Sequence, residues 1–317
     1  AHHTVTFTAP QPAHVLHPNA SACGLLEIAP IGTRDEFCES NLHLAGPEDF
    51  SHLFTKRLPT AHKGDFGHVL VVGGAAGKTG AASMTGLAAL RAGAGLVTVC
   101  SSGTMAVPEL MTEPLGSWDQ VKRISEGKSL LALGPGIGTD QALVELVRRA
   151  VAEIGLPIVV DADGLNALCG WLIPHRSGLI LTPHPGEMSR LCGVTTAQVQ
   201  SDRIGVARSY AVNHGLTLVL KGRNTLTAFP DGQVWVNPTG GPALATGGSG
   251  DILTGLIAGL AAQFPLDHQA AVLAAVWLHG RAGDLAAAKL GEKSVIATDL
   301  IHSLPEAMEE CARLQNE

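Results

Sequence analysis

A glycine-rich pentapeptide is the part of this sequence with the clearest chemical potential. Its residues are Gly247-Gly248-Ser249-Gly250-Asp251, and the mostly apolar stretch Ile252 to Ala262 follows. If this stretch is a helix, its free amides and positive dipole end stabilise a phosphate, and the glycines let that phosphate approach closely. Asp251 could then take a proton from a substrate hydroxyl. The pentapeptide alone also fits a turn in which Asp251 only caps the helix.

A basic segment is the second candidate for binding an anion. Lys221-Gly222-Arg223-Asn224-Thr225 follows an expected strand over Leu216 to Leu220. A cation, a flexible glycine and a hydroxyl at the end of a strand suit a nucleotide phosphate or ribose, because ligands bind at that edge of open α/β sheets. A solvated basic turn is the alternative interpretation of this segment.

Two more glycine-rich segments also lie between an expected strand and an expected helix. Gly73 to Gly80 ends in Gly-Lys-Thr-Gly, but a P-loop needs a glycine where Val72 stands, so we expect backbone contacts to substrate. In the alternative interpretation, an ordinary glycine-rich turn, Lys78 is an incidental surface cation. Gly134-Pro135-Gly136-Ile137-Gly138 lacks the dinucleotide-binding spacing and is expected to allow close backbone approach.

Acidic side chains follow two further expected strands. Asp161 and Asp163 come after one strand, and His184 and Glu187 come after the next. Paired carboxylates at strand ends could position a hydrated Mg²⁺ through water, whereas the alternative is ordinary turn chemistry. We read His184 as a hydrogen-bonding substrate contact rather than a metal ligand, and we assign no metal ligands.

Apolar runs that alternate with helical segments must position these residues. Such alternation predicts an α/β fold whose mostly parallel sheet is covered on both faces. A hairpin is expected from Thr225 to Phe229 and Val234 to Asn237, because Asp231-Gly232 is a strong turn signal. The remaining expected strands are 68–72, 96–100, 130–133, 158–160, 179–181 and 216–220, and the expected helices are 80–92, 141–153, 197–213, 250–263, 268–290 and 298–314.

The first part of the chain does not show this alternation of strands and helices. Short β-like runs at Thr4 to Phe7 and Leu25 to Ile28 are separated by Pro-rich stretches, and two strands cannot bury much of a core. Residues 33–63 are polar and aperiodic, which predicts a linker. We therefore divide the chain into residues 1–50, an appended tail with a linker, and residues 51–317, the main domain.

Composition excludes several classes of partner. The net charge is -7 with no block of Lys or Arg, so nucleic acid and anionic membrane surfaces are poor partners. An anionic small ligand is not excluded, because backbone amides and one or two cations suffice to hold phosphates. The six cysteines show no metal-type spacing, which fits a reducing cytoplasm. The longest apolar stretch, around residues 253–262, is too short to span a membrane.

From about Phe66 to Met308, the chain resembles the ADP/ATP-dependent NAD(P)H-hydrate dehydratases of the ribokinase-like superfamily. Residues 1–32 look like the closing strands of the NAD(P)H-hydrate epimerase domain that is often fused ahead of the dehydratase. We therefore expect the whole protein to carry that domain, and this chain alone not to epimerise. The ordered set of matching motifs is specific, and it comprises residues 71–74, 80–82, 91–97, 134–138, 161–166, 182–187, 221–222 and 246–251.

The resemblance implies a three-layer α/β/α sandwich and the family reaction. In that reaction ADP or ATP phosphorylates the C6 hydroxyl of (S)-NAD(P)H hydrate, phosphate leaves, and NADH or NADPH is restored. It implies that Asp251 is the base. It also implies Mg²⁺, with K⁺ as a second candidate ion, and a homo-oligomer such as a tetramer. The implied anion hole is Gly248, Ser249 and Gly250, the nucleotide contacts are Lys221, Gly222, Arg223, Asn224, Thr225 and Gly250, and the substrate contacts are Ala81, Gly136, Gly138, His184 and Asp251.

One departure and two rival functions remain open. The family usually reads Asn-x-Thr-Gly-Asn ahead of the catalytic loop, and here Gly241 replaces the last Asn. A small-alcohol or vitamin-precursor kinase would use the same Gly-Gly-Ser-Gly-Asp site, and a catalytically silent nucleotide-binding protein would bind without turnover. The sequence does not decide between ADP and ATP, or between NADH and NADPH hydrates.

Overall fold

Six of the expected strands lie side by side in one sheet. The computed structural model describes residues 1–34 and 40–314, and these six strands are parallel to one another. Because they are nearly continuous runs of Val, Ile and Leu, they are buried on both faces, as parallel strands usually are. They are β4 (His68–Val72), β5 (Leu96–Ser101), β7 (Leu130–Leu133), β8 (Ile158–Val160), β9 (Leu179–Leu181) and β10 (Thr217–Leu220).

Four further strands extend this sheet to ten, in the order β3-β12-β11-β10-β9-β8-β7-β4-β5-β6. β11 (Leu226–Ala228) and β12 (Val234–Val236) form the predicted antiparallel hairpin, which is confirmed. β6 (Met111–Pro114) lies at one edge and β3 (Leu42–Leu44) at the other. Within the described residues, β11 is antiparallel to both of its neighbours, whereas every other pairing in the sheet is parallel.

The segment predicted as a linker contributes to the sheet and the core, so that prediction is wrong. β3 pairs with β12 in parallel register, and Phe50 is fully buried. Three short 3₁₀ helices, η3 (Pro47–Asp49), η4 (Ser51–Phe54) and η5 (Lys63–Phe66), continue towards β4. The strand was missed because three residues carry too little periodicity to predict it.

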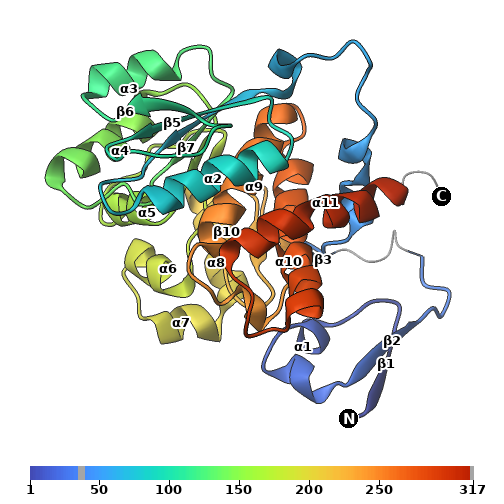
Figure 1. Cartoon of the computed structure of the whole chain (residues 1–317). Helices are drawn as coiled ribbons and strands as arrows, with labels where there is room; N and C mark the ends of the chain where they lie inside the picture. The colour runs from blue at the N-terminus through green and yellow to red at the C-terminus, as the bar shows by residue number, and fades with distance from the viewer. Residues whose placement is uncertain (35–39, 315–317) are drawn as a thin grey trace.

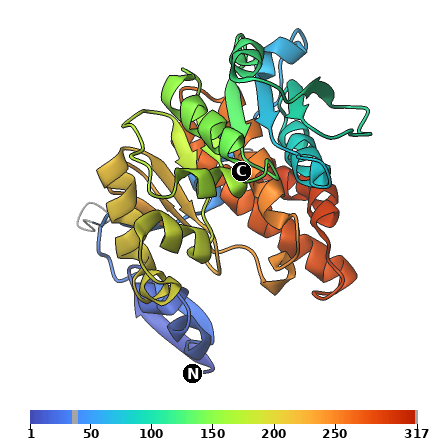
Figure 2. The ribbon, with the colours of Figure 1, turned by 90° about the vertical axis from the view of Figure 1, so that its left-hand side faces the viewer.

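Helices cover both faces of the sheet, which confirms the predicted three-layer arrangement (Figures 1 and 2). Alternate strand residues enter different cores: Val69 and Val71 pack with one helical layer, and Leu70 and Val72 with the other. The first layer is α2 (Thr79–Arg91), α9 (Ser249–Gln263), α10 (His268–Leu290) and α11 (Ala297–Arg313). The second is α3 (Trp118–Ser125), α4 (Gln141–Glu153), α5 (Asp163–Leu168), α6 (Pro185–Cys192), α7 (Thr196–Ser201) and α8 (Arg203–His214).

The single helix predicted over residues 197–213 is two helices. The break lies at Asp202, whose backbone has φ -144° and ψ 67°. The Asp202 side chain accepts a hydrogen bond of 2.9 Å from the amide of Gly205 and so caps α8. The capping residue was hidden inside a run that otherwise reads as one helix.

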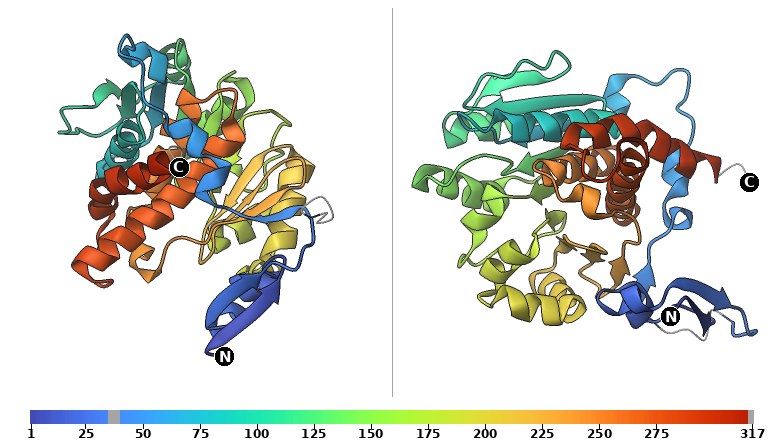
Figure 3. Two further views of the ribbon diagram at one scale, coloured as in Figure 1. Left: turned by 90° about the vertical axis from the view of Figure 1, so that its right-hand side faces the viewer. Right: turned by 60° about the horizontal axis from the view of Figure 1, so that its bottom comes forward.

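The first 34 residues form a separate small unit (Figures 1 and 3). β1 (His3–Phe7) and β2 (Leu25–Ala29) pair in parallel, so the two expected strands are confirmed. Between them lie the short helices α1 (Pro12–Val15) and η1 (Asn19–Ala22). Phe7 and Leu25 are 60% and 69% exposed, so the pair leaves apolar side chains uncovered.

In the described part of the chain, no helix combines the length and the apolar composition needed to cross a membrane.

Candidate active site at the carboxyl ends of the strands

The candidate residues converge because parallel strands end at the same edge of the sheet. The loops after β4, β7, β8, β9 and β10 therefore carry the predicted segments to one place. Gly134 shows how closely these loops approach: its φ is +115°, and a Cβ there would lie 2.1 Å from the carbonyl oxygen of Asp161. Only glycine fits this position, and the loops after β7 and β8 therefore lie against each other.

A buried ion pair joins three elements at this edge. The Asp161 side chain is 1% exposed, and its Oδ1 lies 2.7 Å from Lys221 Nζ. Its Oδ2 accepts a 2.7 Å hydrogen bond from the Thr254 hydroxyl. Asp161 thereby ties the ends of β8 and β10 to the first turns of α9, and both of its oxygens are occupied, as a buried carboxylate requires.

Glu187 is a second buried carboxylate near Lys221. Its Oε2 lies 3.8 Å from Lys221 Nζ. Burial raises the pKa of Glu187, and the Lys221 charge opposes this rise. Burial also opposes the charge of Lys221, but the attraction of Asp161 and Glu187 outweighs it and raises the pKa of Lys221. Lys221 is therefore a fixed, fully charged cation at this edge.

The Gly-Gly-Ser-Gly-Asp segment begins α9 as predicted and faces this cation. Gly248 precedes the helix with φ +91°, and a Cβ on Gly250 would lie 3.4 Å from Lys221 Nζ. The amides of Gly250 and Asp251, which donate no hydrogen bond within the described chain, therefore lie at the same helix start as the Lys221 ammonium. An anion held by both would be neutralised by one full charge and the helix dipole.

Asp251 has a raised pKa, as suits a general base, and its side chain does not cap α9. Its carboxylate accepts no hydrogen bond from the described residues, unlike Asp267, which accepts one from the amide of Ala270. Burial raises the pKa of Asp251 to about 6, the nearby Asp161 charge raises it further, and Lys221 opposes both. A carboxylate with a pKa near the working pH is suited to general base catalysis.

Of the basic segment, Lys221 is the residue that reaches this cluster. Arg223 instead donates a 2.7 Å hydrogen bond to the carbonyl of Gly240. Asn224 is buried with φ +52°, and its amide donates to the carbonyl of Asn237 at 3.3 Å. The Thr225 hydroxyl donates to the carbonyl of Gly222 at 3.1 Å. These three side chains brace the loop that carries Lys221.

The predicted substrate contacts lie along the same edge. His184 is the N-cap residue of α6, is exposed, and has its Nε2 3.5 Å from Glu187 Oε1. The Gly138 amide donates a 3.0 Å hydrogen bond to Asp163 Oδ2. Gly136 lies in the same loop as Gly138, and Ala81 lies in the first turn of α2, the helix that packs against α9.

One interpretation of the charged side chains here needs correction, and one of them gains a defined partner. Lys78 is an exposed cation whose Nζ lies 3.2 Å from Asp163 Oδ2. Asp161 and Asp163 do not face a common point: Asp161 binds Lys221 and Thr254, whereas Asp163 binds Lys78 and Gly138. Within residues 1–34 and 40–314, no group of three or more His, Cys, Asp or Glu side chains could hold a metal ion.

Sequence reasoning missed two polar residues that belong to this site. Thr254 lies in the apolar part of α9 and binds Asp161. His279 lies in the middle of α10, and its Nε2 is 3.0 Å from the Ser249 hydroxyl oxygen and 2.9 Å from the Ser249 carbonyl oxygen. The available signal was a polar side chain inside an otherwise apolar helix, because such a side chain needs a buried partner.

Gly241 leaves room for the side chain that the family pattern expects. Its backbone is extended, with φ -123°, and a Cβ there would lie 3.7 Å from Asp284 Oδ1. No clash explains the replacement of asparagine by glycine.

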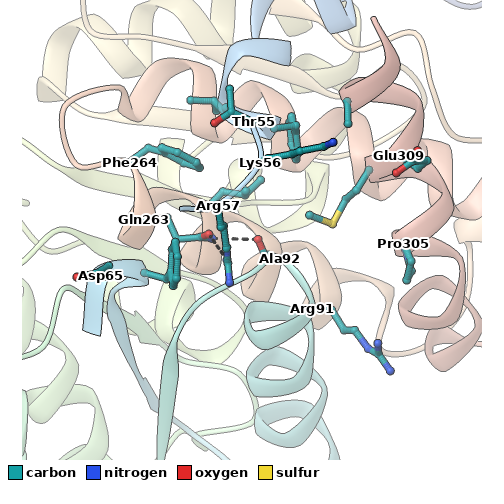
Figure 4. Close-up of a pocket in the computed structure, with 16 residues that line it drawn as sticks. Thr55, Lys56, Arg57, Asp65, Arg91, Ala92, Gln263, Phe264, Pro305 and Glu309 are labelled. Carbon is teal, nitrogen blue, oxygen red and sulfur yellow. Dashed lines mark hydrogen bonds between the residues drawn. The ribbon is translucent and has the colours of Figure 1, made fainter. Parts of the chain in front are cut away.

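A cavity of about 590 Å³ lies at a different place (Figure 4). Its lining comes from residues 53–57 and 65–66, from the C-terminal parts of α2 and α9, and from α11. It contains none of the predicted site residues. The cavity therefore offers no support for the candidate active site.

Comparison with known proteins relates the chain to one family. A family model described as NAD(P)H-hydrate dehydratase matches residues 69–306. A bifunctional NAD(P)H-hydrate repair enzyme from Moorella thermoacetica is 43% identical over 325 residues, which cover 95% of this chain and 61% of that protein. The chain thus spans about three fifths of the length of that relative. An ADP-dependent (S)-NAD(P)H-hydrate dehydratase from Neisseria meningitidis is 39% identical over 265 residues, covering 80% of this chain and 86% of that protein.

The fold agrees with this relationship. The crystal structure of the ADP/ATP-dependent NAD(P)H-hydrate dehydratase from Bacillus subtilis, co-crystallised with ATP/Mg²⁺, is 33% identical and has a TM-score of 0.76, covering 86% of this chain and 99% of that one. The predicted ribokinase-like fold is confirmed. Kinases share this fold at much lower identity, so the fold alone does not separate the two activities. The family model and the identity to curated relatives show that the chain belongs to the NAD(P)H-hydrate dehydratase family.

Proposed function

We propose that this protein restores NADH or NADPH from their (S)-hydrates at the expense of ADP or ATP. The observation that carries the proposal is that the half-buried Asp251 carboxylate, the Lys221 cation and the first amides of α9 lie together at the strand ends, in a chain of the NAD(P)H-hydrate dehydratase family. A dehydratase that phosphorylates its substrate needs these three functions: a base, a cation and an anion hole.

The reaction can be followed through the residues of this chain. Asp251 takes the proton of the C6 hydroxyl, and the C6 oxygen then bonds to the terminal phosphorus of the nucleotide while the bond to its leaving oxygen breaks. Lys221 and the amides of Gly248, Ser249 and Gly250 stabilise the charge on the transferring group. The C6–O bond then breaks, phosphate leaves with the electron pair, and loss of a neighbouring ring proton re-forms the double bond. One of those amide donors is typically worth about 10²–10³ in rate.

The residues that we assign to the nucleotide and to the hydrate all lie at the carboxyl ends of the strands. We assign the nucleotide to Lys221, Gly222, Arg223, Asn224, Thr225 and Gly250, and the hydrate to Ala81, Gly136, Gly138, His184 and Asp251. The two sets meet at Gly250 and Asp251, which are adjacent in the first turn of α9. This juxtaposition supports transfer from the nucleotide to the hydrate within one site.

The site also suits Mg²⁺ bound together with a nucleotide. Mg²⁺ is usually held by one or two carboxylates, substrate phosphates and waters. Asp161 is already occupied by Lys221 and Thr254, so Glu187, 3.8 Å from Lys221 Nζ, is the carboxylate that would hold the hydrated ion beside the nucleotide. When bound, Mg²⁺ would neutralise phosphate charge. K⁺ stays a prediction of the resemblance.

Product analysis tests the proposal and separates it from a kinase. Purified protein is incubated with (S)-NADH hydrate, Mg²⁺ and either nucleotide, and the absorbance of the reduced nicotinamide is followed. We expect recovery of NADH with one inorganic phosphate released for each NADH. A stable phosphoester without NADH would mean that the protein is a kinase, and nucleotide binding without any turnover would mean a silent binding protein.

The partners of the whole protein are also proposals. Bifunctional relatives support a fused epimerase domain ahead of this chain, and the exposed apolar residues of β1 and β2 are compatible with further covering strands. We propose that the protein is a cytoplasmic homo-oligomer, with a tetramer as the form to test.

A further inference from the structure

A buried histidine in α10 contacts Ser249, the first residue of α9. His279 is 9% exposed and lies in α10, between apolar residues of the core. Its Nε2 lies 3.0 Å from Ser249 Oγ and 2.9 Å from the Ser249 carbonyl oxygen. Ser249 begins α9 and is itself buried. The imidazole therefore supports the segment that supplies the anion hole.

These distances fix which ring nitrogen carries the hydrogen. A carbonyl oxygen can only accept a hydrogen bond, so at 2.9 Å from the Ser249 carbonyl, the Nε2 atom must be the donor. The ring is also uncharged near neutral pH, because burial, opposed by the hydrogen bond to the Ser249 carbonyl and aided by the Lys221 charge, lowers the pKa of His279 to about 4. His279 is thus a neutral imidazole with its hydrogen on Nε2.

This assignment determines what the Ser249 hydroxyl can do. Because Nε2 already carries a hydrogen, Ser249 Oγ must act as an acceptor towards it. No other partner of that hydroxyl occurs among the described residues. The hydroxyl hydrogen is therefore free to be donated to a ligand at the start of α9.

We propose that His279 is a positioning residue that turns the Ser249 hydroxyl into a hydrogen-bond donor for the terminal phosphate of the bound nucleotide. The inference rests on the proposed function for the identity of the ligand. It adds that a core histidine, which touches no ligand itself, sets the direction of one donor in the anion hole. Ser249 is adjacent to Gly250, where a Cβ would lie 3.4 Å from Lys221 Nζ, so the Ser249 hydroxyl belongs to the same helix start as this cation.

The affinity for ATP with Mg²⁺ tests this coupling without any hydrate. We expect Ser249→Ala and His279→Leu each to weaken binding by about tenfold or more, the effect of losing one hydrogen bond to a charged group. In the double variant we expect less than a twofold further loss, because both changes remove the same donor. We expect His279→Gln to restore most of the affinity, because its amide can still donate.

His68 provides the matched control. It is the first residue of β4 and therefore lies at the amino-terminal ends of the strands, away from the candidate active site at their carboxyl ends. Its Nε2 is 2.8 Å from the Thr98 hydroxyl. We expect His68→Leu to lower thermal stability but leave the ATP affinity and the effect of Ser249→Ala unchanged. This control separates the general effect of removing a hydrogen-bonded, half-buried histidine from the specific effect of removing His279.

Nitrogen NMR of the wild-type protein tests the assignment without a variant that has to fold. The expected spectrum shows His279 with its hydrogen on Nε2 at neutral pH. A hydrogen on Nδ1, a charged ring, or fully additive effects of Ser249→Ala and His279→Leu would overturn the inference. If the wild type binds ATP with this coupling but restores no NADH, the proposed function fails and the inference stands.

Discussion

Asp251 is the residue on which the chemistry depends. Its sequence context left open whether it is a base or a helix cap, and the structure favours a base because its carboxylate binds no helix amide in the described chain while burial raises its pKa to about 6. Asp267, at the start of α10, shows what a capping aspartate looks like in the same molecule.

Replacing Asp251 by asparagine should remove the base and keep the shape. We expect Asp251→Asn to lower turnover of NADH hydrate by about 10²–10⁴-fold, the usual contribution of general base catalysis, and to change nucleotide affinity by only a few fold. Asp267→Asn is the control, and it should leave turnover unchanged. Wild-type turnover in Asp251→Asn would refute the assignment.

The raised pKa of Asp251 predicts a pH dependence of activity. Because the base must be ionised, we expect kcat/KM to fall as the pH drops below about 6. A profile that stays flat well below that pH would show that another group takes the proton.

The same shift predicts an effect on stability. A carboxyl whose folded pKa is raised above its ordinary value of 3.8 contributes stability at low pH that is lost as the pH rises through about 6. At pH 8 we therefore expect Asp251→Asn to be about 1–2 kcal/mol more stable than the wild type, with a difference that shrinks as the pH falls. Thermal unfolding at several pH values measures this, and a variant less stable at pH 8 would contradict it.

Some roles of side chains could be predicted from the sequence and others could not. Asp251 and Lys221 stand in recognisable strand-end and helix-start motifs, and the structure brings them together. His279 and Thr254 could not be predicted, because each is a single polar residue in an apolar helix and its partner is distant in sequence. Their roles depend on tertiary contacts.

At the scale of elements, the start of α9 requires a glycine at position 248. With φ +91°, a Cβ on Gly248 would lie 2.5 Å from the end of the Met84 side chain. We expect Gly248→Ala to destabilise the protein by about 1–3 kcal/mol through backbone strain and crowding. Gly247→Ala is the matched control, because nothing lies within 4 Å of a Cβ there. Chemical denaturation compares the two, and equal stability would contradict the strain argument.

The buried elements could be predicted because their signal is local. Strands such as β4, β7 and β8 are short runs of branched apolar residues, and they occur at the residues expected. β3 and β6 escaped prediction because they are three and four residues long and lie at the sheet edges, where β3 is at most half-buried and β6 is exposed throughout. Their places depend on the neighbouring strand rather than on their own sequence.

At the scale of the whole molecule, Arg57 links the segment before β4 to the helical layer that contains α2 and α9. Its guanidinium lies 3.5 Å from the centre of the Phe66 ring and donates to the carbonyl of Gly93 at 2.6 Å. It also donates to Gln263 at 3.1 Å (Figure 4). We expect Arg57→Ala to lower stability by about 1–2 kcal/mol. Arg91 lines the same cavity without a hydrogen bond or ion pair to the described residues, so Arg91→Ala should have almost no effect in the same unfolding assay.

The division of the chain at residue 50 and the assembly of the whole protein remain predictions. Residues 42–44 already belong to the main sheet, so a boundary drawn from composition falls inside the folded region. The β1–β2 pair has too little core of its own for its sequence to specify what covers it.

The central claim is that the nucleotide phosphorylates the C6 oxygen of the hydrate at the start of α9. The most direct measurement uses (S)-NADH hydrate whose C6 hydroxyl carries a heavy oxygen isotope, with the products analysed by mass spectrometry. We predict that the label appears in the inorganic phosphate, because the C6–O bond breaks after the oxygen has been phosphorylated. Label found in water while NADH is restored would contradict the account.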